Sequence, residues 1–162
     1  MNHPRIVIGV AGLVVHLAPA ALVTLGLGSC VAVVLHDAEA GIGGLAHVLL
    51  PAPTSSRVGG PEGRFASTAI PALLRDMVAL GGQASRIRAR LIGGASMFAS
   101  LMAPGTVQVG ERNIVASREA LRAARVPLIG EAVGGDFGRS VEFDLRDGTV
   151  KITSYAHAPE LL

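Results

Sequence analysis

The sequence predicts an α+β fold, a layered β-sandwich of mixed sheets flanked by two main helices. Three observations lead to this prediction. Several short runs are rich in Val, Ile and Leu and end at turn-forming residues, as strands do. Only two stretches place apolar residues at helical spacing. Some of the strands pair as hairpins, so we expect sheets in contact with each other and helices covering an outer face.

A single domain spanning residues 1–162 is expected, because this length supports one core without covalent staples. Half of the residues are apolar, yet the chain has no Trp, one Tyr and four Phe. The core is therefore built from Val, Leu, Ile and Ala. The one cysteine excludes an internal disulfide framework and a CxxC metal site, and it suits a reducing compartment.

Charge gives little support for nucleic-acid binding. The formal net charge is +2, and the chain lacks the aromatic platforms and lysine-rich tracts of such proteins. No pair of His or carboxylate residues has helical metal-ligand spacing, so no metal is expected. The glycine-rich pieces match neither a P-loop nor a dinucleotide fingerprint. The sequence predicts that no cofactor is needed.

Residues 6–23, IVIGVAGLVVHLAPAALV, are apolar enough to resemble a signal peptide or a membrane span. His16 and Pro19 interrupt this run, and two glycines lie among its β-branched residues. Buried strands also give near-continuous apolar runs. We expect a first strand at residues 6–16, a turn at Pro19, a short segment ending at Thr24, and no membrane insertion.

The remaining elements follow from periodicity and punctuation. A helix is predicted at residues 65–80, with Ser67 or Thr68 as its cap and Pro71 in its first turn. A half-buried strand is predicted at residues 86–92, with three arginines on one face. A second helix is expected at residues 113–125, capped by Asn113. A strand at residues 128–133 and a hairpin of residues 141–145 and 149–153 complete the sheets, and the loop at residues 51–63 is a candidate flap.

The stretch at residues 24–47, TLGLGSCVAVVLHDAEAGIGGLAH, is the centre of the chain. Two apolar strands flank the turn at residues 37–40. If that turn is a four-residue hairpin loop, His36 faces Gly41 and Cys30 faces His47. Directly opposed residues project from one face with Cβ atoms about 4.5–5.5 Å apart. The predicted register therefore brings a thiol and an imidazole together.

A lone cysteine is more often a small core residue than a nucleophile. Here the Gly28-Ser29 turn can aim backbone N–H groups at a reacting carbonyl oxygen, as an oxyanion hole requires. His47 is placed to accept the thiol proton and so to raise the fraction of thiolate. Thr24 lies on the approach to the same turn and can orient His47. His36, by contrast, is interpreted as a solvated turn histidine.

The chain resembles the CheD family of bacterial chemotaxis proteins, the chemoreceptor glutamine deamidases. Two blocks carry the resemblance, TLGLGSCVAV and GGLAHVLLP, and it continues through ALLRDMVALGG, LIGGASMF, GERNI and GGDFGRSVEFD. The resemblance implies a cysteine-dependent amidohydrolase whose catalytic residues are Cys30, His47 and Thr24. It also implies a fold similar to that of toxin deamidase domains.

The same resemblance implies a substrate and a location. Glutamine side chains of methyl-accepting chemotaxis receptors would be converted to glutamate, with ammonia released through a thioester intermediate. The receptor segments concerned lie in the cytoplasm, so a cytoplasmic protein is expected. A CheC-type phosphatase is a possible partner in the family, and a monomer is the expected state. Two alternatives stay open: a non-catalytic binding module of the chemotaxis system, and a glutamyl methylesterase.

Overall fold

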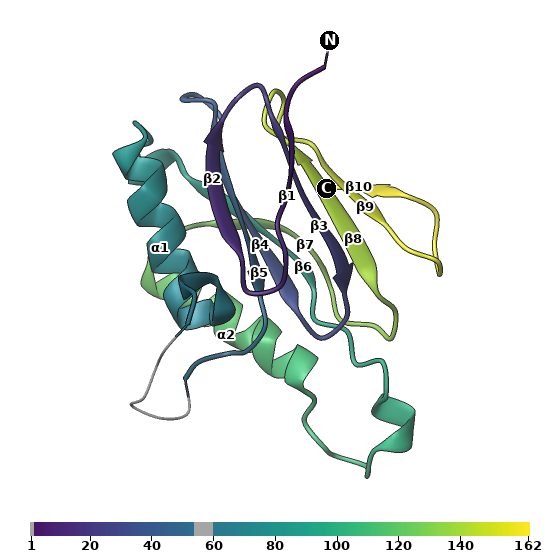
Figure 1. Ribbon diagram of the computed structural model, residues 1–162. Coiled ribbons are helices and arrows are strands. Elements are labelled where there is room, and N and C mark those ends of the chain that lie inside the picture. The colour runs from purple at the N-terminus through teal and green to yellow at the C-terminus, as the bar shows by residue number, and fades with distance from the viewer. Residues whose placement is uncertain (1, 54–59) are drawn as a thin grey trace.

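Two five-stranded sheets and two α-helices form the molecule in a computed structural model that describes residues 2–53 and 60–162 (Figure 1). The first sheet has the order β1-β3-β8-β9-β10, with bounds Arg5–Val7, Ala21–Leu27, Arg139–Asp144, Val150–Thr153 and Glu160–Leu161. The second sheet has the order β2-β5-β4-β6-β7, with bounds Leu13–Leu17, Ile42–Val48, Val31–Asp37, Arg88–Gly93 and Leu128–Val133. The helices are α1 (Ala66–Ala79) and α2 (Val109–Ala123), with short 3₁₀ turns η1 (Glu62–Arg64), η2 (Ala84–Arg86) and η3 (Ala99–Leu101).

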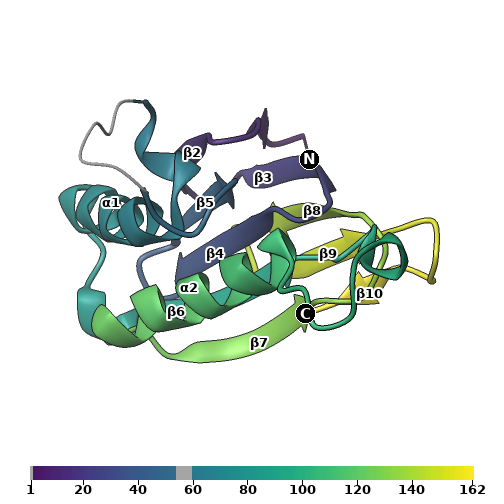
Figure 2. The same ribbon diagram turned by 90° about the horizontal axis from the view of Figure 1, so that it is seen from below.

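Both sheets are mixed. β1 pairs with β3 and β6 pairs with β7 in parallel, and the other neighbours are antiparallel. Both helices cover one face of the second sheet (Figure 2). The predicted α+β sandwich of mixed sheets with two main helices is therefore confirmed.

Two apolar layers hold the fold together. One lies between the two sheets and includes Leu22, Ala32 and Phe143. The other lies between the second sheet and the helices and includes Val33 and Leu73. Because β4 sits between both layers, every one of its side chains is buried. This position explains why its sequence is apolar throughout rather than alternating.

The predicted strand at residues 6–16 is wrong, because the chain changes sheets within it. β1 belongs to the first sheet and β2 to the second. A turn joins them, in which Ala11 has φ of 65° and the Gly12 N–H donates a 2.9 Å hydrogen bond to the Gly9 carbonyl. A Cβ on Gly12 would lie 2.8 Å from that carbonyl oxygen, so the turn requires glycine there. Among the described residues, no helix has the length and apolar character to cross a membrane.

The register of the β4–β5 hairpin differs from the prediction by two residues. His47 faces Ala32 instead of Cys30, and Asp37 is still within the ladder, facing Ile42. The loop is residues 38–41, closed by a 3.1 Å hydrogen bond from the Ala40 N–H to the Asp37 carboxylate. A shift of two residues preserves the side on which each residue projects. Cys30 and His47 therefore remain on the same face of the sheet.

Both predicted helices exist, but their starts differ. The α1 N-terminus has no side-chain cap, and Pro71 lies in the helix interior rather than in its first turn. α2 starts at Val109, so Asn113 is a buried interior residue and not a cap. The helix begins earlier because Gly110 packs tightly against the Gly94 and Ala95 carbonyls.

The C-terminal elements agree closely with the sequence. The strand at residues 128–133 is confirmed as β7, and the predicted hairpin is confirmed as β8 and β9. The strand predicted from residue 86 begins at Arg88, because Arg86 ends η2 and binds the Asp37 carboxylate. The short strand β10 was not predicted. The central part of the candidate flap, residues 54–59, lies outside the described residues.

Candidate active site

A hydrogen bond joins the two sheets at Thr24 and His47. The Thr24 hydroxyl donates to the Ile8 carbonyl at 2.7 Å, and its oxygen lies 2.7 Å from His47 Nδ1. The hydroxyl has only one proton, which the Ile8 carbonyl takes, so the Nδ1–H of His47 must donate to Thr24 Oγ1. This tautomer leaves Nε2 with a free lone pair.

His47 is suited to act as a base. Its side chain is buried, and Nε2 has no hydrogen-bond partner within the described residues. Burial lowers the pKa of His47 below its ordinary value, because the charged imidazolium loses its hydration. The neutral imidazole therefore predominates at neutral pH, with an unshared electron pair available on Nε2.

Cys30 lies in the apolar layer between the sheets, on the face that also carries His47. It immediately precedes β4 and packs in the same cluster as Leu27, Ala32 and Leu45. Burial raises the pKa of the Cys30 thiol, and this effect exceeds the lowering by a backbone hydrogen bond. The resting pair is therefore a neutral thiol and a neutral imidazole, which differs from the expectation of a raised thiolate fraction.

The turn that carries Cys30 is fixed by the segment after β6. The Ala95 N–H donates to the Gly28 carbonyl and the Gly94 N–H donates to the Cys30 carbonyl, each at 2.8 Å. Gly93 and Gly94 have φ values of 106° and 68°, a region that favours glycine. A side chain on Gly93 would also collide with the Cys30 carbonyl. The GGASM motif thus provides the close backbone approach that holds this turn.

Asn113 contacts both parts of the site from α2. Its side-chain amide donates to the Ser29 carbonyl at 2.8 Å and to the Leu49 carbonyl at 3.0 Å. The prediction that Asn113 caps the helix is wrong, and its contacts were missed. One signal was present in the sequence: Asn113 occupies the buried stripe of α2 with Gly110, Ile114, Ser117 and Leu121. A polar residue in such a stripe requires partners.

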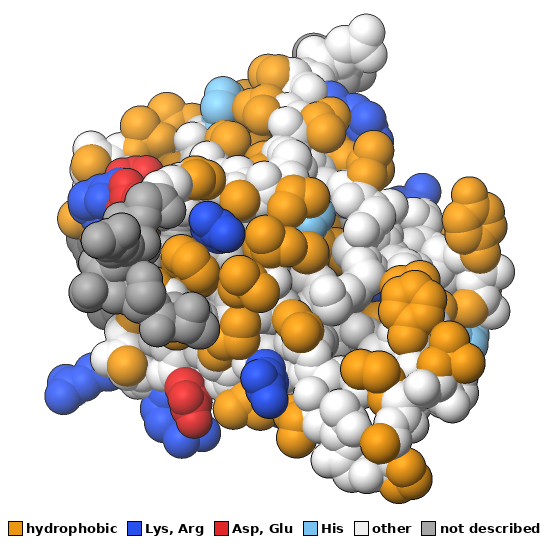
Figure 3. All heavy atoms as spheres, turned by 60° about the horizontal axis from the view of Figure 1, so that its bottom comes forward, with side chains coloured by type: hydrophobic (Ala, Val, Ile, Leu, Met, Phe, Trp, Pro, Cys, Tyr) orange, Lys and Arg blue, Asp and Glu red, His pale blue; other side chains and the backbone are white. Residues whose placement is uncertain are grey.

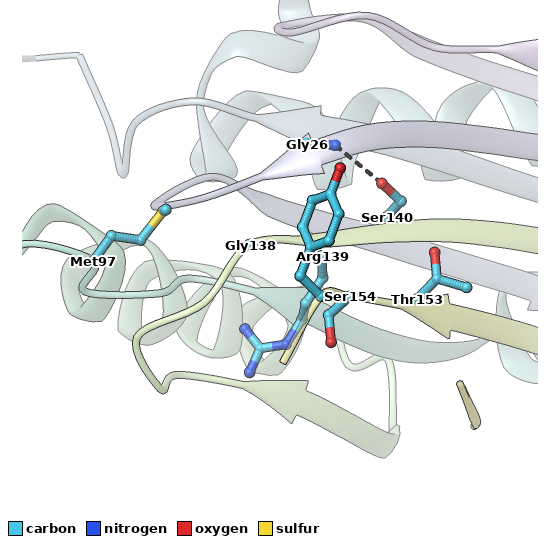
Figure 4. A pocket seen from close by; sticks show the side chains of 8 residues that line it. Gly26, Met97, Gly138, Arg139, Ser140, Thr153 and Ser154 are labelled. Carbon is cyan, nitrogen blue, oxygen red and sulfur yellow. Dashed lines mark hydrogen bonds between the residues drawn. The ribbon is translucent and has the colours of Figure 1, made fainter. Parts of the chain in front are cut away.

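Two surface pockets flank the turn. A pocket of 480 Å³ lies between Gly26 and the β8–β9 end of the first sheet, with Arg139 and Tyr155 in its wall (Figure 4). In this wall the Gly26 N–H donates a 3.2 Å hydrogen bond to the Ser140 hydroxyl. A second pocket of 210 Å³ is lined by Ser29 and the residues that follow β6. Met97 lines both pockets, but only the second includes a residue of the turn itself, Ser29.

The surface next to the second pocket is apolar. The segment between β6 and α2, together with the first residue of α2, exposes several large hydrophobic side chains: Met97, Phe98, Leu101, Met102, Val107 and Val109. On the face shown in Figure 3, hydrophobic side chains spread widely between a few charged ones. A cluster of exposed hydrophobic side chains such as the one around Phe98 is typical of a surface that contacts another protein.

The remaining histidines do not join this site. His36 was predicted to be solvated, but it is buried near the hairpin loop and packs edge-on against Phe143 at 5.3 Å. His16 Nδ1 contacts the Leu17 carbonyl at 2.7 Å. Among residues 2–53 and 60–162, no group of three His, Cys, Asp or Glu side chains is arranged to hold a metal ion.

Fold and site together describe a two-sheet α+β protein with a thiol, an imidazole and a hydroxyl between its two sheets. Residues 49–154 match the family model described as CheD chemotactic sensory transduction. The chain belongs to the CheD family.

Curated relatives extend the match across the site. The probable chemoreceptor glutamine deamidase CheD of Caldanaerobacter subterraneus subsp. tengcongensis is 36% identical over 150 residues, which cover 93% of each chain. A span of that length includes residues 24–47. The probable chemoreceptor glutamine deamidase CheD 2 of Geobacter metallireducens is 42% identical over 135 residues, 83% of each chain.

A solved structure shares the fold at low sequence identity. The crystal structure of Neisseria meningitidis protein NMB0706, described as DUF152, aligns with a TM-score of 0.54 at 12% identity. The alignment covers 90% of this chain and 70% of that chain. The likeness supports the two-sheet architecture alone.

Proposed function

We propose that this protein is a cysteine hydrolase that converts glutamine side chains of methyl-accepting chemotaxis receptors to glutamate. The observation that carries the proposal is the hydrogen bond between Thr24 and His47, which leaves a buried Nε2 lone pair on the face that holds Cys30. The names of the curated relatives support the substrate. The exposed apolar surface beside the turn suits a protein substrate better than a small polar one.

The first half of the proposed reaction acylates the enzyme. His47 Nε2 accepts the Cys30 thiol proton, and the thiolate attacks the side-chain carbonyl carbon of glutamine. Backbone N–H groups at Ser29 and Cys30 donate to the oxyanion that forms. Protonated His47 then donates its proton to the departing amine, and ammonia leaves a thioester between the substrate and Cys30.

The second half returns the enzyme to its starting state. His47 takes a proton from water, and the resulting hydroxide attacks the thioester carbonyl. The carbon–sulfur bond breaks, the Cys30 sulfur recovers the proton from His47, and glutamate is released. Thr24 keeps Nδ1 protonated and the ring in place throughout. A glutamyl methyl ester would form the same thioester with methanol as the leaving group, so methylesterase activity is the alternative that uses the same residues.

The proposal is tested with receptor cytoplasmic fragments and mass spectrometry of their glutamines. Wild type should convert specific glutamines, while Cys30→Ala and His47→Ala should lose nearly all conversion. Thr24→Ala should lose less, because water can partly replace an orienting hydroxyl. If wild type and Cys30→Ala both bind several receptors and neither converts any glutamine, the protein is a binding module instead.

This substrate would place the protein in the cytoplasm, where receptor signalling segments lie. Binding of a CheC-type phosphatase and the monomeric state remain predictions. Size-exclusion chromatography with light scattering measures the oligomeric state directly. A pull-down from the source organism with the Cys30→Ala variant tests binding of a CheC-type phosphatase.

A further inference from the structure

We propose that Asn113 is a positioning residue that aims the Cys30 N–H at the substrate oxyanion. The inference rests on the proposed function and extends it to a residue outside the Cys30–His47 hairpin. Asn113 is fully buried, and its amide nitrogen bonds to two carbonyls that are distant from it in sequence. These carbonyls belong to the turn that carries Cys30 and to the end of the strand that carries His47.

The amide of Asn113 can make these contacts in only one orientation. Both partners are carbonyl oxygens, which accept hydrogen bonds, so the NH₂ group must face them and Oδ1 must face away. Oδ1 is buried and has no partner within the described residues. An unpaired buried acceptor is costly. Because the fold keeps this unpaired Oδ1, we infer that an amide is present at position 113 for its two donated hydrogen bonds.

The bond to Ser29 fixes the direction of the next N–H group. The Ser29 carbonyl and the Cys30 N–H belong to the same planar trans peptide, and in such a peptide the C=O and N–H point in opposite directions. Asn113 holds the carbonyl toward α2, and the Cys30 N–H therefore points away from α2. This N–H donates no hydrogen bond to another residue in the described part of the chain.

The preceding peptide is fixed in a similar way. The Gly28 carbonyl accepts from the Ala95 N–H at 2.8 Å, so the Ser29 N–H is directed to the opposite side of its own peptide plane. Within the described residues, this N–H also has no acceptor. The orientations of two consecutive N–H groups are thus fixed through their peptide planes, one by the backbone of the GGASM segment and one by the side chain of Asn113; the Ser29 N–H has no acceptor among the described residues, and the Cys30 N–H contacts only its own sulfur. Of these two supports, only the Asn113 bond can be removed by changing a side chain without altering the backbone.

The test compares Asn113→Asp and Asn113→Ala with Ser117→Ala. The aspartate nearly preserves the shape of asparagine but replaces two donors with acceptors, which repel the Ser29 and Leu49 carbonyls. Ser117 is a matched control, because it is buried one turn later on α2 and its hydroxyl has no partner among the described residues. We expect kcat for glutamine conversion to fall about tenfold to hundredfold in both Asn113 variants, with KM unchanged. Ser117→Ala should keep the wild-type kcat.

Alkylation of Cys30 by iodoacetamide separates positioning of the oxyanion donors from a general structural role. This reaction uses the thiol but forms no oxyanion. The Asn113 variants should therefore lose much more of their kcat than of their alkylation rate, which changes only through the effect of the Cys30 N–H on the thiol pKa. A wild-type kcat in Asn113→Asp would overturn the inference, and so would a parallel fall of alkylation and kcat. Absence of conversion by wild type would instead refute the proposed function, and the inference with it.

If both Asn113 variants fail to fold, a measurement on the wild type tests whether the Cys30 N–H donates to the oxyanion. A peptide aldehyde that mimics glutamine forms a hemithioacetal with the Cys30 thiol, and its oxygen occupies the oxyanion position. The NMR signal of the Cys30 amide proton should move downfield when this adduct forms, because the N–H gains an acceptor. An adduct that leaves this signal in place would overturn the inference.

Discussion

Thr24 and His47 belong to different sheets, and their hydrogen bond of 2.7 Å crosses the apolar layer between them. The Thr24 hydroxyl proton is used by the Ile8 carbonyl, which makes His47 Nδ1 the donor. A contact between sheets therefore selects the imidazole tautomer. This relationship gives Thr24 a role that can be tested apart from its packing.

Thr24→Val should lower kcat for glutamine conversion by about tenfold, the effect of one buried hydrogen bond. Valine has nearly the same volume but cannot accept a hydrogen bond from Nδ1–H. The tautomer with an unprotonated Nε2 is therefore no longer selected. Thr24→Ser keeps the hydroxyl and should retain most of the activity. Nitrogen chemical shifts of the His47 ring measure the tautomer directly. Wild-type kcat in Thr24→Val would show that the tautomer is selected by another group.

The pH dependence of the two reactive groups follows from their burial. The pKa of His47 is lowered, so the neutral base persists below its usual titration range. We expect kcat/KM to stay constant down to about pH 6.5 and to fall only below it. The pKa of the Cys30 thiol is raised, so alkylation of the free enzyme should be slow at neutral pH and should still be rising with pH at about pH 8.5, where the thiolate is a minor form. Rapid, pH-independent alkylation near neutrality would reveal a preformed thiolate–imidazolium pair instead.

His36 should make the fold sensitive to acid. Burial lowers its pKa, and the positive charge of Arg90 lowers it further, against the opposing effects of Asp37 and Asp147. The unfolded chain therefore binds a proton at higher pH than the folded chain does. Stability attributable to His36 is complete above about pH 6.5 and declines as the pH falls below that value.

Urea unfolding between pH 7 and pH 5 measures this effect. Wild type should lose unfolding free energy across the interval, and His36→Gln should lose less because residue 36 no longer titrates. His47 has a lowered pKa as well, so some acid sensitivity should remain in the variant. Equal slopes for the two proteins would contradict the assignment to His36.

Asp37 should be the most sensitive charged residue for stability. Its carboxylate is fully buried and accepts from Arg86 and from the backbone N–H groups of Ala40 and Gln83. Despite the opposing effect of burial, these bonds lower the pKa of Asp37 to about 2. Asp37→Asn should lower the free energy of unfolding by about 3 kcal/mol, because the guanidinium loses its buried counterion. Asp144→Asn, at a more exposed ion pair with Arg146, is the control and should cost less.

The residues proposed to react could be selected from the sequence because they lie close together in the chain. Cys30 and His47 are in one hairpin, so alternation alone placed them on a common face, even though the register was shifted by two residues. The shift arises because Asp37 stays in the ladder, held there by Arg86 from a distant segment. Local turn statistics contain no information about such a partner.

The contacts of Asn113 could not be predicted from local sequence patterns, for the same physical reason. Its acceptors precede it by 84 and 64 residues, and only the packing of α2 on the second sheet brings them together. The N-terminal run shows a related limit. Hydropathy favoured buried strands there, but Val7, Val10 and Leu17 are exposed. The division between two sheets depends on a turn at Ala11 that periodicity does not reveal.

The supports of the Cys30 turn come from later in the chain than the reactive residues do. Thr24, Cys30 and His47 are synthesised first, whereas Gly94, Ala95 and Asn113 follow, and β8, the neighbour of β3, follows later still. A nascent chain that ends near residue 90 would contain every side chain of the proposed site but would lack the contacts that Gly94, Ala95 and Asn113 make with the turn. Amidase activity should therefore arise only when the C-terminal half has folded, and this order would keep an unfinished chain on the ribosome from modifying neighbouring proteins.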